Sequence, residues 1–337
     1  MTLPVARPTA HIRIDHYSAV HLAAETARAL ARDSGLPGAM PDRAAVVASE
    51  LGSNLAKHAT DGALFLQPLA VGTGVEILAA DRGPGILDLR RCLTDGYTTT
   101  DTLGTGLGAV GRIATAFTIR SEPGSGTLAG ARLAPPGGPR PAHEDVAAVC
   151  LAADGEETSG DAYAVIDTGT VRTAIVVDGL GHGAEAAEPA HTALRAFGRA
   201  PDLPLPEILT GVHRALRRTR GAAVGLLRLG QDRAEYCGVG NVRALVRTRD
   251  EIHHRLTGLP GVAGLSLQAT PVHRFALEPG ATAVLHTDGI DHRWARSPSP
   301  FLLRLPPSLL TAALAHSHRI SRDDATVLAL TPRQRHS

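Results

Sequence analysis

Aromatic residues and lysine are both scarce in this chain of 337 residues. Phe, Trp and Tyr together make up 3% of it, and Lys57 is the only lysine. So few rings argue against a stacking platform for single-stranded nucleic acid, which needs several aromatic side chains in a row. Arginine carries nearly all of the positive charge, which we attribute to a bias of composition.

Cysteine and long apolar runs are lacking as well. The three cysteines, Cys92, Cys150 and Cys237, are scattered and form no CxxC pair, which argues against disulfide bonds and a zinc site. No apolar run approaches the roughly 18 residues of a membrane span. The N-terminus lacks the charged and apolar regions of a signal peptide. We therefore expect a reduced, cytoplasmic protein that makes no contact with a membrane.

An excess of charge of either sign is also missing. Lys and Arg number 34 against 33 for Asp and Glu, so the net charge is +1. A nucleic-acid-binding domain usually carries a basic excess, and a disordered acidic tail carries the opposite. With 43% hydrophobic residues, the composition is that of a globular protein that does not bind nucleic acid.

The length favours two domains, at about 150 residues each. The clearest break is residues 135–141, a run of proline and glycine that sustains neither helix nor strand. We therefore predict an N-terminal domain at residues 1–134, a linker at 135–143 and a second domain at 144–332.

The spacing of apolar residues predicts a mixture of helices and strands in both halves, an α+β protein. In the first half we expect helices at residues 18–34, with Ser18 as the N-cap, and at 41–59, with Pro41 in the first turn. Strands are expected at 11–15, 63–70, 75–81, 117–121 and 128–133. Helices on one face of an antiparallel sheet are the natural arrangement of these elements.

The second half is richer in strands. Strands are expected at 146–153, 162–167, 171–178, 223–229, 234–239, 244–247, 281–286 and 326–330. Helices are expected at 184–199 and 205–218. These elements favour two sheets with helices outside them.

Three motifs in the first half suit a nucleotide. Glu50, Asn54 and His58 are each four residues apart, so they share one face of the predicted helix. The run of residues 81–85, Asp-Arg-Gly-Pro-Gly, follows a strand, where the carboxylate can accept a hydrogen bond from an adenine amino group. The run of residues 104–108, Gly-Thr-Gly-Leu-Gly, opens a helix and presents N–H groups to phosphates.

In this order the motifs resemble the GHKL ATPases, and the short segment between residues 86 and 103 resembles anti-sigma-factor serine kinases of the RsbW/RsbT type. The resemblance implies a GHKL (Bergerat-type) α/β sandwich that binds ATP and Mg²⁺. It makes Glu50 the base for the substrate hydroxyl, Asn54 a Mg²⁺ ligand and Asp81 the adenine contact. The remaining nucleotide-binding residues that it implies are Gly83, Gly85, Gly104, Thr105, Gly106, Leu107 and Gly108.

Three neighbouring residues stay open. His58 is either a phosphoacceptor or, in the simpler interpretation, a structural histidine below the nucleotide. Lys57 either reaches a phosphate or lies in solvent. Arg112, one turn into the helix after the glycine-rich loop, is a further candidate for contact with the γ-phosphate.

Aspartates at the ends of predicted strands dominate the second half. Asp161 opens a strand, Asp178 ends the next within Asp-Gly-Leu-Gly-His-Gly, Asp288 follows another, and the pair Asp323-Asp324 precedes the last. Isolated Asp-Gly pairs are usually turns. Four such carboxylates can instead converge, and their hard oxygen atoms suit Mg²⁺ or Mn²⁺. Two such ions can activate water for attack on a phosphoryl group.

Together these motifs resemble the PP2C-type serine/threonine phosphatases of the SpoIIE/RsbX branch, and they imply a PP2C-like α-β-β-α sandwich. The resemblance makes Asp178 the residue that bridges two metal ions and Gly179 a ligand through its carbonyl. Asp161, Asp288 and Asp323 complete the ligand set, with Asp324 as the alternative to Asp323.

The roles of several other residues in the second half each have two interpretations. His182 either shapes the start of a helix or acts as an acid, and Asn241 either forms a turn or binds metal. The basic stretch 214–220 is either a solvated helix end or a docking surface for an acidic partner. The short segment 289–300 suggests a reduced flap beside the metals.

The two resemblances together imply a bifunctional kinase and phosphatase that acts on STAS-domain proteins, which are anti-sigma antagonists or stressosome scaffolds. A sigma factor or downstream regulator is a further implied partner, and a homodimer is compatible with the kinase type. One alternative is a phosphatase with an ATP-binding regulatory domain. The other is a binding switch without catalysis, against which the presence of Glu50 argues.

Overall fold

The structure is a computed structural model that describes residues 8–89, 106–136 and 145–333. The chain divides into two compact units. The N-terminal unit comprises Thr9–Pro141 and Ser308–His316, and the C-terminal unit comprises Met1–Pro8, Ala142–Pro307 and Ser317–Ser337. The domain boundaries drawn from the sequence stay predictions. No helix of the described residues is long and apolar enough to cross a membrane.

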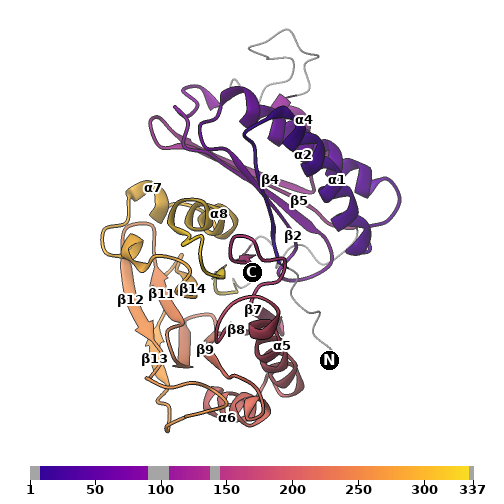
Figure 1. The fold of residues 1–337 in the computed structure, drawn as a ribbon. Coiled ribbons are helices and arrows are strands. Elements are labelled where there is room, and N and C mark those ends of the chain that lie inside the picture. Colours follow the sequence, from indigo (N-terminus) through magenta and orange to yellow (C-terminus); the bar gives the residue numbers. More distant parts are fainter. Residues whose placement is uncertain (1–7, 90–105, 137–144, 334–337) are drawn as a thin grey trace. The chain divides into compact units, whose positions relative to one another are not determined.

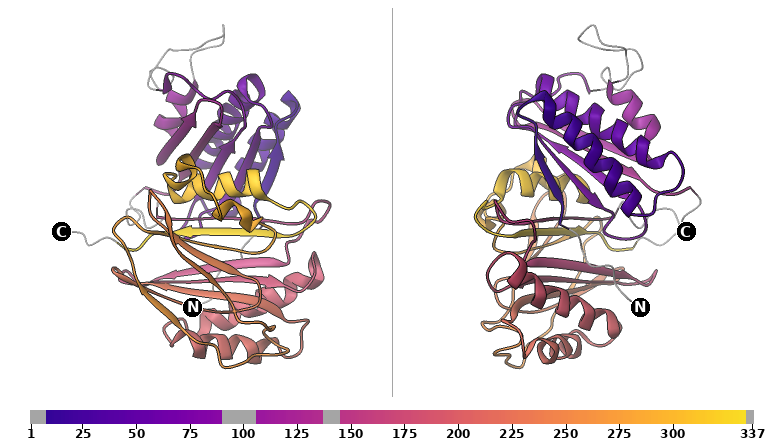
Figure 2. Two further views of the ribbon diagram at one scale, coloured as in Figure 1. Left: turned by 90° about the vertical axis from the view of Figure 1, so that its left-hand side faces the viewer. Right: turned by 45° about the vertical axis from the view of Figure 1, so that its right-hand side comes forward.

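The N-terminal unit is built on one five-stranded antiparallel sheet of order β1-β2-β3-β5-β4 (Figure 1). Its strands are β1 (Ala10–Arg13), β2 (Ala63–Pro68), β3 (Val75–Ala80), β4 (Ala116–Glu122) and β5 (Gly126–Leu133). Its helices are α1 (Tyr17–Asp33), α2 (Met40–His58) and α4 (Gly106–Ile113), together with most of α8 (Pro307–His318). Figure 2 shows α1 and α2 lying side by side along the sheet.

Small side chains let α1 and α2 pack closely on the sheet. Ala23, Ala27 and Ala31 line the buried face of α1 at helical spacing, and Leu51 of α2 lies in the same core. The structure corrects the predicted cap of α1. The N-cap is His16, whose Nδ1 accepts the N–H of Ser18 at 3.2 Å, because the helix begins one residue earlier than predicted and Ser18 already lies in its first turn.

The C-terminal unit holds two five-stranded antiparallel sheets, of order β13-β10-β9-β8-β7 and β12-β11-β14-β15-β6. The strands of the first sheet are β7 (Asp161–Asp167), β8 (Arg172–Gly179), β9 (Ala222–Leu229), β10 (Arg233–Val239) and β13 (His273–Ala276). The strands of the second are β6 (Val146–Leu151), β11 (Arg243–Arg247), β12 (Ile252–Thr257), β14 (Thr282–His286) and β15 (Ala325–Leu330).

Two long helices cover the first of these sheets. They are α5 (Ala184–Arg199) and α6 (Leu205–Leu216), which lie along β8 and β9 in Figures 1 and 2. Phe197 of α5 and Leu209 of α6 are buried against apolar side chains of the sheet. The short helices η1 (His292–Ala295) and α7 (Pro300–Leu303) belong to the same unit. The prediction of two sheets is confirmed, and helices α5 and α6 lie outside the first of them as predicted.

The sequence did not predict β12, β13, α7 or α8. Strand β12 reads Ile-His-His-Arg-Leu-Thr and β13 has only four residues, so neither shows a clear apolar alternation. Helix α8 is buried along most of its length, so its apolar residues surround the helix and give no one-sided period.

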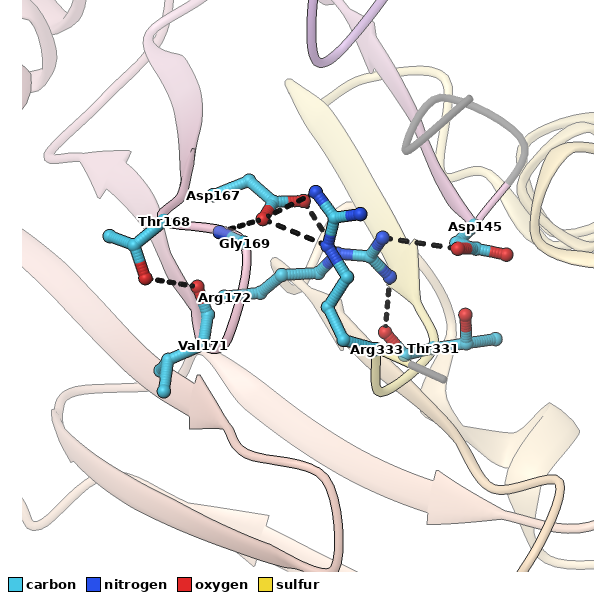
Figure 3. A network of polar contacts seen from close by, with 8 residues as sticks. All are labelled: Asp145, Asp167, Thr168, Gly169, Val171, Arg172, Thr331 and Arg333. Carbon is cyan, nitrogen blue, oxygen red and sulfur yellow. Dashed lines mark hydrogen bonds and ion pairs between the residues drawn. The ribbon is translucent and has the colours of Figure 1, made fainter. Parts of the chain in front are cut away.

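An ion-pair network around the buried Arg172 side chain closes one end of the sandwich (Figure 3). The Arg172 side chain is completely buried and its Nε lies 2.9 Å from Asp167 Oδ2. Its Nη2 lies 3.1 Å from Asp145 Oδ2, and Nη1 donates to the carbonyl of Thr331 at 2.5 Å. Arg333 Nε reaches the other oxygen of Asp167 at 3.0 Å. Because Asp145 precedes β6 and Thr331 follows β15, one guanidinium joins the two sheets.

Candidate functional site

Strand ends from both sheets of the C-terminal unit meet at the edge opposite to Arg172. Strand β7 begins at Asp161 and β8 ends beside it, with Asp161 paired to Asp178 across the ladder. In the second sheet, β14 ends just before Asp288. The neighbouring strand β15 begins just after Asp324, at the same edge. Antiparallel pairing therefore brings the predicted phosphatase carboxylates of each sheet to one edge, and the packing of the two sheets brings these edges together.

Asp161 is the most enclosed of these groups. Its side chain is buried, and its Oδ2 accepts a 2.7 Å hydrogen bond from Thr287 Oγ1 of the opposite sheet. Burial first, and then the charge of Asp178, raise the pKa of Asp161 well above its ordinary value. Thr287 was not singled out from the sequence, although its place between β14 and Asp288 was a usable signal.

Asp178, Asp288 and Asp323 face one another. Burial, followed by the charges of Asp288 and Asp323, raises the pKa of Asp178 to about 8. Burial and the charge of Asp288 also raise the pKa of Asp323. The amide of Asn241 donates to Asp288 Oδ2 at 2.7 Å and so orients that carboxylate. These groups repel one another unless positive charge lies between them.

Asp324 is placed differently from its neighbour Asp323. Its Oδ1 accepts the N–H of Ala153 at 2.8 Å and its Oδ2 accepts the N–H of Gly160 at 2.7 Å. Both oxygens are therefore engaged in holding the loop between β6 and β7. Burial raises the pKa of Asp324 against the effect of these bonds.

Two glycines allow this close assembly. A Cβ at Gly179 would lie 2.1 Å from the carbonyl oxygen of Ala186, and one at Gly160 would lie 2.4 Å from Ala186 Cβ. The N–H of Gly179 donates to the carbonyl of Gly160 at 3.1 Å. Any side chain at Gly179 or Gly160 would push α5 away from the carboxylates.

The oxygen atoms of these carboxylates suit a hard cation, although the side chains do not yet surround a single point as metal ligands do. Within residues 145–333 and the other described ranges, no three His, Cys, Asp or Glu side chains form a ready metal site. Burial, and then the charges of neighbouring carboxylates, raise the pKa values of Asp161, Asp178 and Asp323, which marks a place where negative charge lacks compensation. Carboxylate oxygens around such a place fit Mg²⁺ or Mn²⁺.

The burial of Asp178 and its repulsion by Asp288 and Asp323 predict that the metal-free protein gains stability when Asp178 is replaced by asparagine. A carboxyl whose pKa rises from 3.8 to about 8 on folding costs stability as pH rises through that window, since the unfolded chain ionises first. We expect D178N in EDTA to be more stable than the unaltered chain by about 2 kcal/mol at pH 8, and by less at pH 5. Urea unfolding at both pH values measures this, and equal or lower stability at pH 8 would contradict it.

In the N-terminal unit, Glu50 and Asn54 lie one turn apart on α2, both partly buried. Asn54 Nδ2 is buried and has no hydrogen-bond partner among the described residues. Such an atom is costly unless a ligand or water satisfies it. His58 and Lys57 are exposed at the end of the same helix.

Asp81 follows β3, and its Oδ1 accepts the N–H groups of Gly83 at 2.7 Å and Thr127 at 3.3 Å. Burial raises the pKa of Asp81 against these bonds. A Cβ at Gly83 would lie 3.3 Å from the carbonyl oxygen of His58, so this loop adjoins the end of α2. Gly85 has φ +78° and lies so close to Glu122 that a Cβ would approach its carbonyl oxygen to 2.6 Å.

The glycine-rich loop is only partly described. Gly106, Leu107 and Gly108 form the start of α4, which packs against α2. Gly104 and Thr105 lie outside the described residues. The described part of the unit thus brings α2, the loop after β3 and the start of α4 together.

Comparison with known proteins matches both halves of the chain. Residues 168–333 match the family described as Stage II sporulation protein E (SpoIIE). The serine/threonine-protein kinase RsbT of Bacillus subtilis (strain 168) is 34% identical over 107 residues, which are 31% of this chain and 80% of RsbT. The phosphoserine phosphatase RsbX of the same organism is 24% identical over 140 residues, which are 41% of this chain and 70% of RsbX.

Solved structures share the fold of part of the chain. A structure from work on the bacterial stressosome is 28% identical with a TM-score of 0.51, and the match covers 56% of this chain and 98% of that one. The RsbU and RsbW domains of a Mycobacterium tuberculosis protein are 23% identical with a TM-score of 0.50, covering 57% of this chain and 62% of that one. The chain therefore has a SpoIIE-type, PP2C-like serine/threonine phosphatase domain at residues 168–333, and through its N-terminal part it belongs to the family of the kinase RsbT.

Proposed function

We propose that this protein is a bifunctional switch enzyme that phosphorylates and dephosphorylates serine or threonine on STAS-domain partners. The observation that carries the phosphatase half is the convergence of strand-end carboxylates at one edge, where burial first, and then the charges of Asp288 and Asp323, raise the pKa of Asp178 to about 8. The unsatisfied buried amide of Asn54, one turn from Glu50, supports the kinase half and its GHKL-type nucleotide site.

In the phosphatase half, Asp161, Asp178, Asp288, Asp323 and the carbonyl of Gly179 would hold two Mg²⁺ or Mn²⁺ ions, with Asp178 as the ligand that both would share. When bound, such ions supply an activated water and polarise the phosphoryl group. The chain's other residues hold the ligands in place. Thr287 fixes one oxygen of Asp161 and Asn241 fixes one of Asp288, while Asp324 anchors the loop before β7.

In the kinase half, Glu50 accepts the proton of the substrate hydroxyl as that oxygen bonds to the γ-phosphorus of ATP and the bond to the bridging oxygen of ADP breaks. Asn54 would hold Mg²⁺ through its side-chain oxygen, and Asp81 would accept a hydrogen bond from the adenine amino group. The N-terminus of α4 and the loop from Gly104 to Gly108 hold the phosphates. Positioning and charge neutralisation supply most of the rate in such a transfer.

The relatives support this pairing of activities, since RsbT is named a kinase and RsbX a phosphoserine phosphatase. The stressosome structure supports a STAS-containing scaffold as the partner class. Opposed activities on one chain would only consume ATP if they shared one phosphosite without control. Either the two halves act on different sites, or partner binding selects one of them.

Transfer of label from γ-labelled ATP to a purified STAS protein tests this proposal. We expect D178A to accumulate labelled STAS protein, because removal is blocked, and E50A to give none. In a second arm, release of phosphate from the labelled protein should require divalent metal and Asp178. If D178A binds ATP but the STAS protein acquires no label, the protein is a phosphatase with an ATP-binding regulatory unit. Release of phosphate without divalent metal would overturn the two-metal site.

A further inference from the structure

Four arginines lie together at the end of α6 and in the turn that follows it. Arg214, Arg217, Arg218 and Arg220, here called the arginine strip, are all exposed. Among the described residues Arg214, Arg217 and Arg218 have no acidic partner. Arg214 lies in the last turn of α6 and Arg217 and Arg218 directly follow the helix, so like charges follow one another closely along the chain. An unpaired positive surface of this kind favours an anionic partner.

The arginine strip reaches the loop that follows Asp178. Arg220 Nη1 lies 3.8 Å from where a Cβ at Gly181 would stand, and its Nη2 pairs with Glu185 in the first turn of α5. The N–H of Leu180 donates to the carbonyl of Gly221 at 3.3 Å. The strip is therefore continuous with the candidate metal site.

Exposed apolar side chains border the same place. Leu180 is 40% exposed and Leu265 is 62% exposed. Leu265 Cγ lies 3.4 Å from where a Cβ at Gly221 would stand, next to Arg220. The surface beside the carboxylates thus combines positive charge with two apolar contacts, as a protein docking site does.

We propose that the arginine strip docks an acidic segment flanking the phosphorylated residue of a protein substrate, with Leu180 and Leu265 contacting apolar side chains near that residue. The inference rests on the proposed phosphatase site. Arginine forms forked hydrogen bonds with carboxylates, and a basic surface beside the site speeds the encounter with an acidic partner. The strip thereby selects acidic phosphoproteins over other phosphate esters, whereas the metal site that the carboxylates would form acts on any phosphate ester that reaches it.

Two synthetic phosphoserine peptides of equal length test the docking, one with four glutamates beside the phosphoserine and one with four glutamines. The full chain is assayed with Mn²⁺ on both peptides and on p-nitrophenyl phosphate. We expect kcat/KM for the glutamate peptide to exceed that for the glutamine peptide by about tenfold, mainly through KM, and the ratio to fall with added salt. In the triple variant R214E, R217E and R218E the ratio should drop to about one or below.

The matched control is the triple variant R195E, R199E and R249E, which makes the same change of charge. Arg195 and Arg199 are exposed on the far half of α5, and Arg249 is exposed beyond the end of β11, away from the carboxylates. This control should keep the peptide preference of the unaltered chain. If the strip variant unfolds, the single variant R217A still tests the idea, with an expected loss of about threefold in the ratio.

The outcomes separate the two proposals. No hydrolysis of any of the three substrates by the unaltered chain would count against the proposed phosphatase site. Hydrolysis with the same peptide preference in the strip variant and the control would overturn the docking surface and leave the phosphatase site standing.

Discussion

Replacement of Asp178 by asparagine is expected to lower kcat for phosphoserine hydrolysis by about a thousandfold or more. Asp178 lies between Asp161 on the neighbouring strand and the carboxylates of Asp288 and Asp323, so it is the group best placed to bridge two ions. If Asp178 is the shared ligand of the proposed two-ion site, loss of its charge removes that ligand, and metal catalysis supplies several kcal/mol of transition-state stabilisation. Steady-state rates on a phosphoserine peptide across a Mn²⁺ titration measure the loss.

The control for this variant is D232N. Asp232 is exposed in the turn between β9 and β10, at the other end of the first sheet from Asp178. Its replacement should therefore leave kcat unchanged. Urea unfolding of D178N and of the unaltered chain separates lost catalysis from lost folding, since D178N is expected to be the more stable of the two without metal. Retention of more than a tenth of the rate by D178N would contradict its bridging role.

Replacement of Arg172 by alanine is expected to destabilise the C-terminal unit by about 3–5 kcal/mol, the cost of removing one partner from a buried ion pair. The side chains of Arg172 and Asp167 are 0% and 4% exposed, and the guanidinium joins strand ends of two sheets. Burial raises the pKa of Asp167, but bonds from Arg333, the N–H of Gly169 and Arg172 together lower it below its ordinary value. Its contribution is therefore present at neutral pH and lost as pH falls below about 4.

Urea unfolding with and without Mn²⁺ measures the loss of stability in R172A. Mn²⁺ should stabilise only the unit that binds it, so the transition that shifts with Mn²⁺ belongs to the C-terminal unit. The control is R333A. Arg333 is 26% exposed, and its replacement leaves Asp167 paired with Arg172. The free energy of unfolding should therefore fall by about 1 kcal/mol or less in R333A. Equal losses in R172A and R333A, or a loss in R172A below about 1 kcal/mol, would show that the network does not stabilise the sandwich.

The core elements could be predicted because their patterns are local. Strands such as β8 and β15 are short apolar runs that end at an aspartate or begin after one, and α1 and α2 repeat small apolar residues at helical spacing. Helix α8 was missed because it is buried along most of its length, which a single sequence does not reveal. The cap of α1 was misplaced by two residues, a usual scale of error at helix ends.

The sequence by itself determined which chemical groups stand at strand ends, since an aspartate after an apolar run and a glycine beside it are properties of neighbouring residues. From these alone it determined that the protein holds a carboxylate-rich site in one half and a nucleotide-like motif set in the other. The metal and nucleotide roles of these residues stay predictions.

Only the tertiary structure decided what each carboxylate touches. Asp323 and Asp324 are indistinguishable in the sequence, yet Asp324 is engaged by the N–H groups of Ala153 and Gly160, more than 150 residues away, while Asp323 faces Asp288. The bond from Thr287 to Asp161 and the closure by Arg172 likewise cross between sheets. Such contacts depend on how two sheets pack, and that packing is fixed by the whole core rather than by any local pattern.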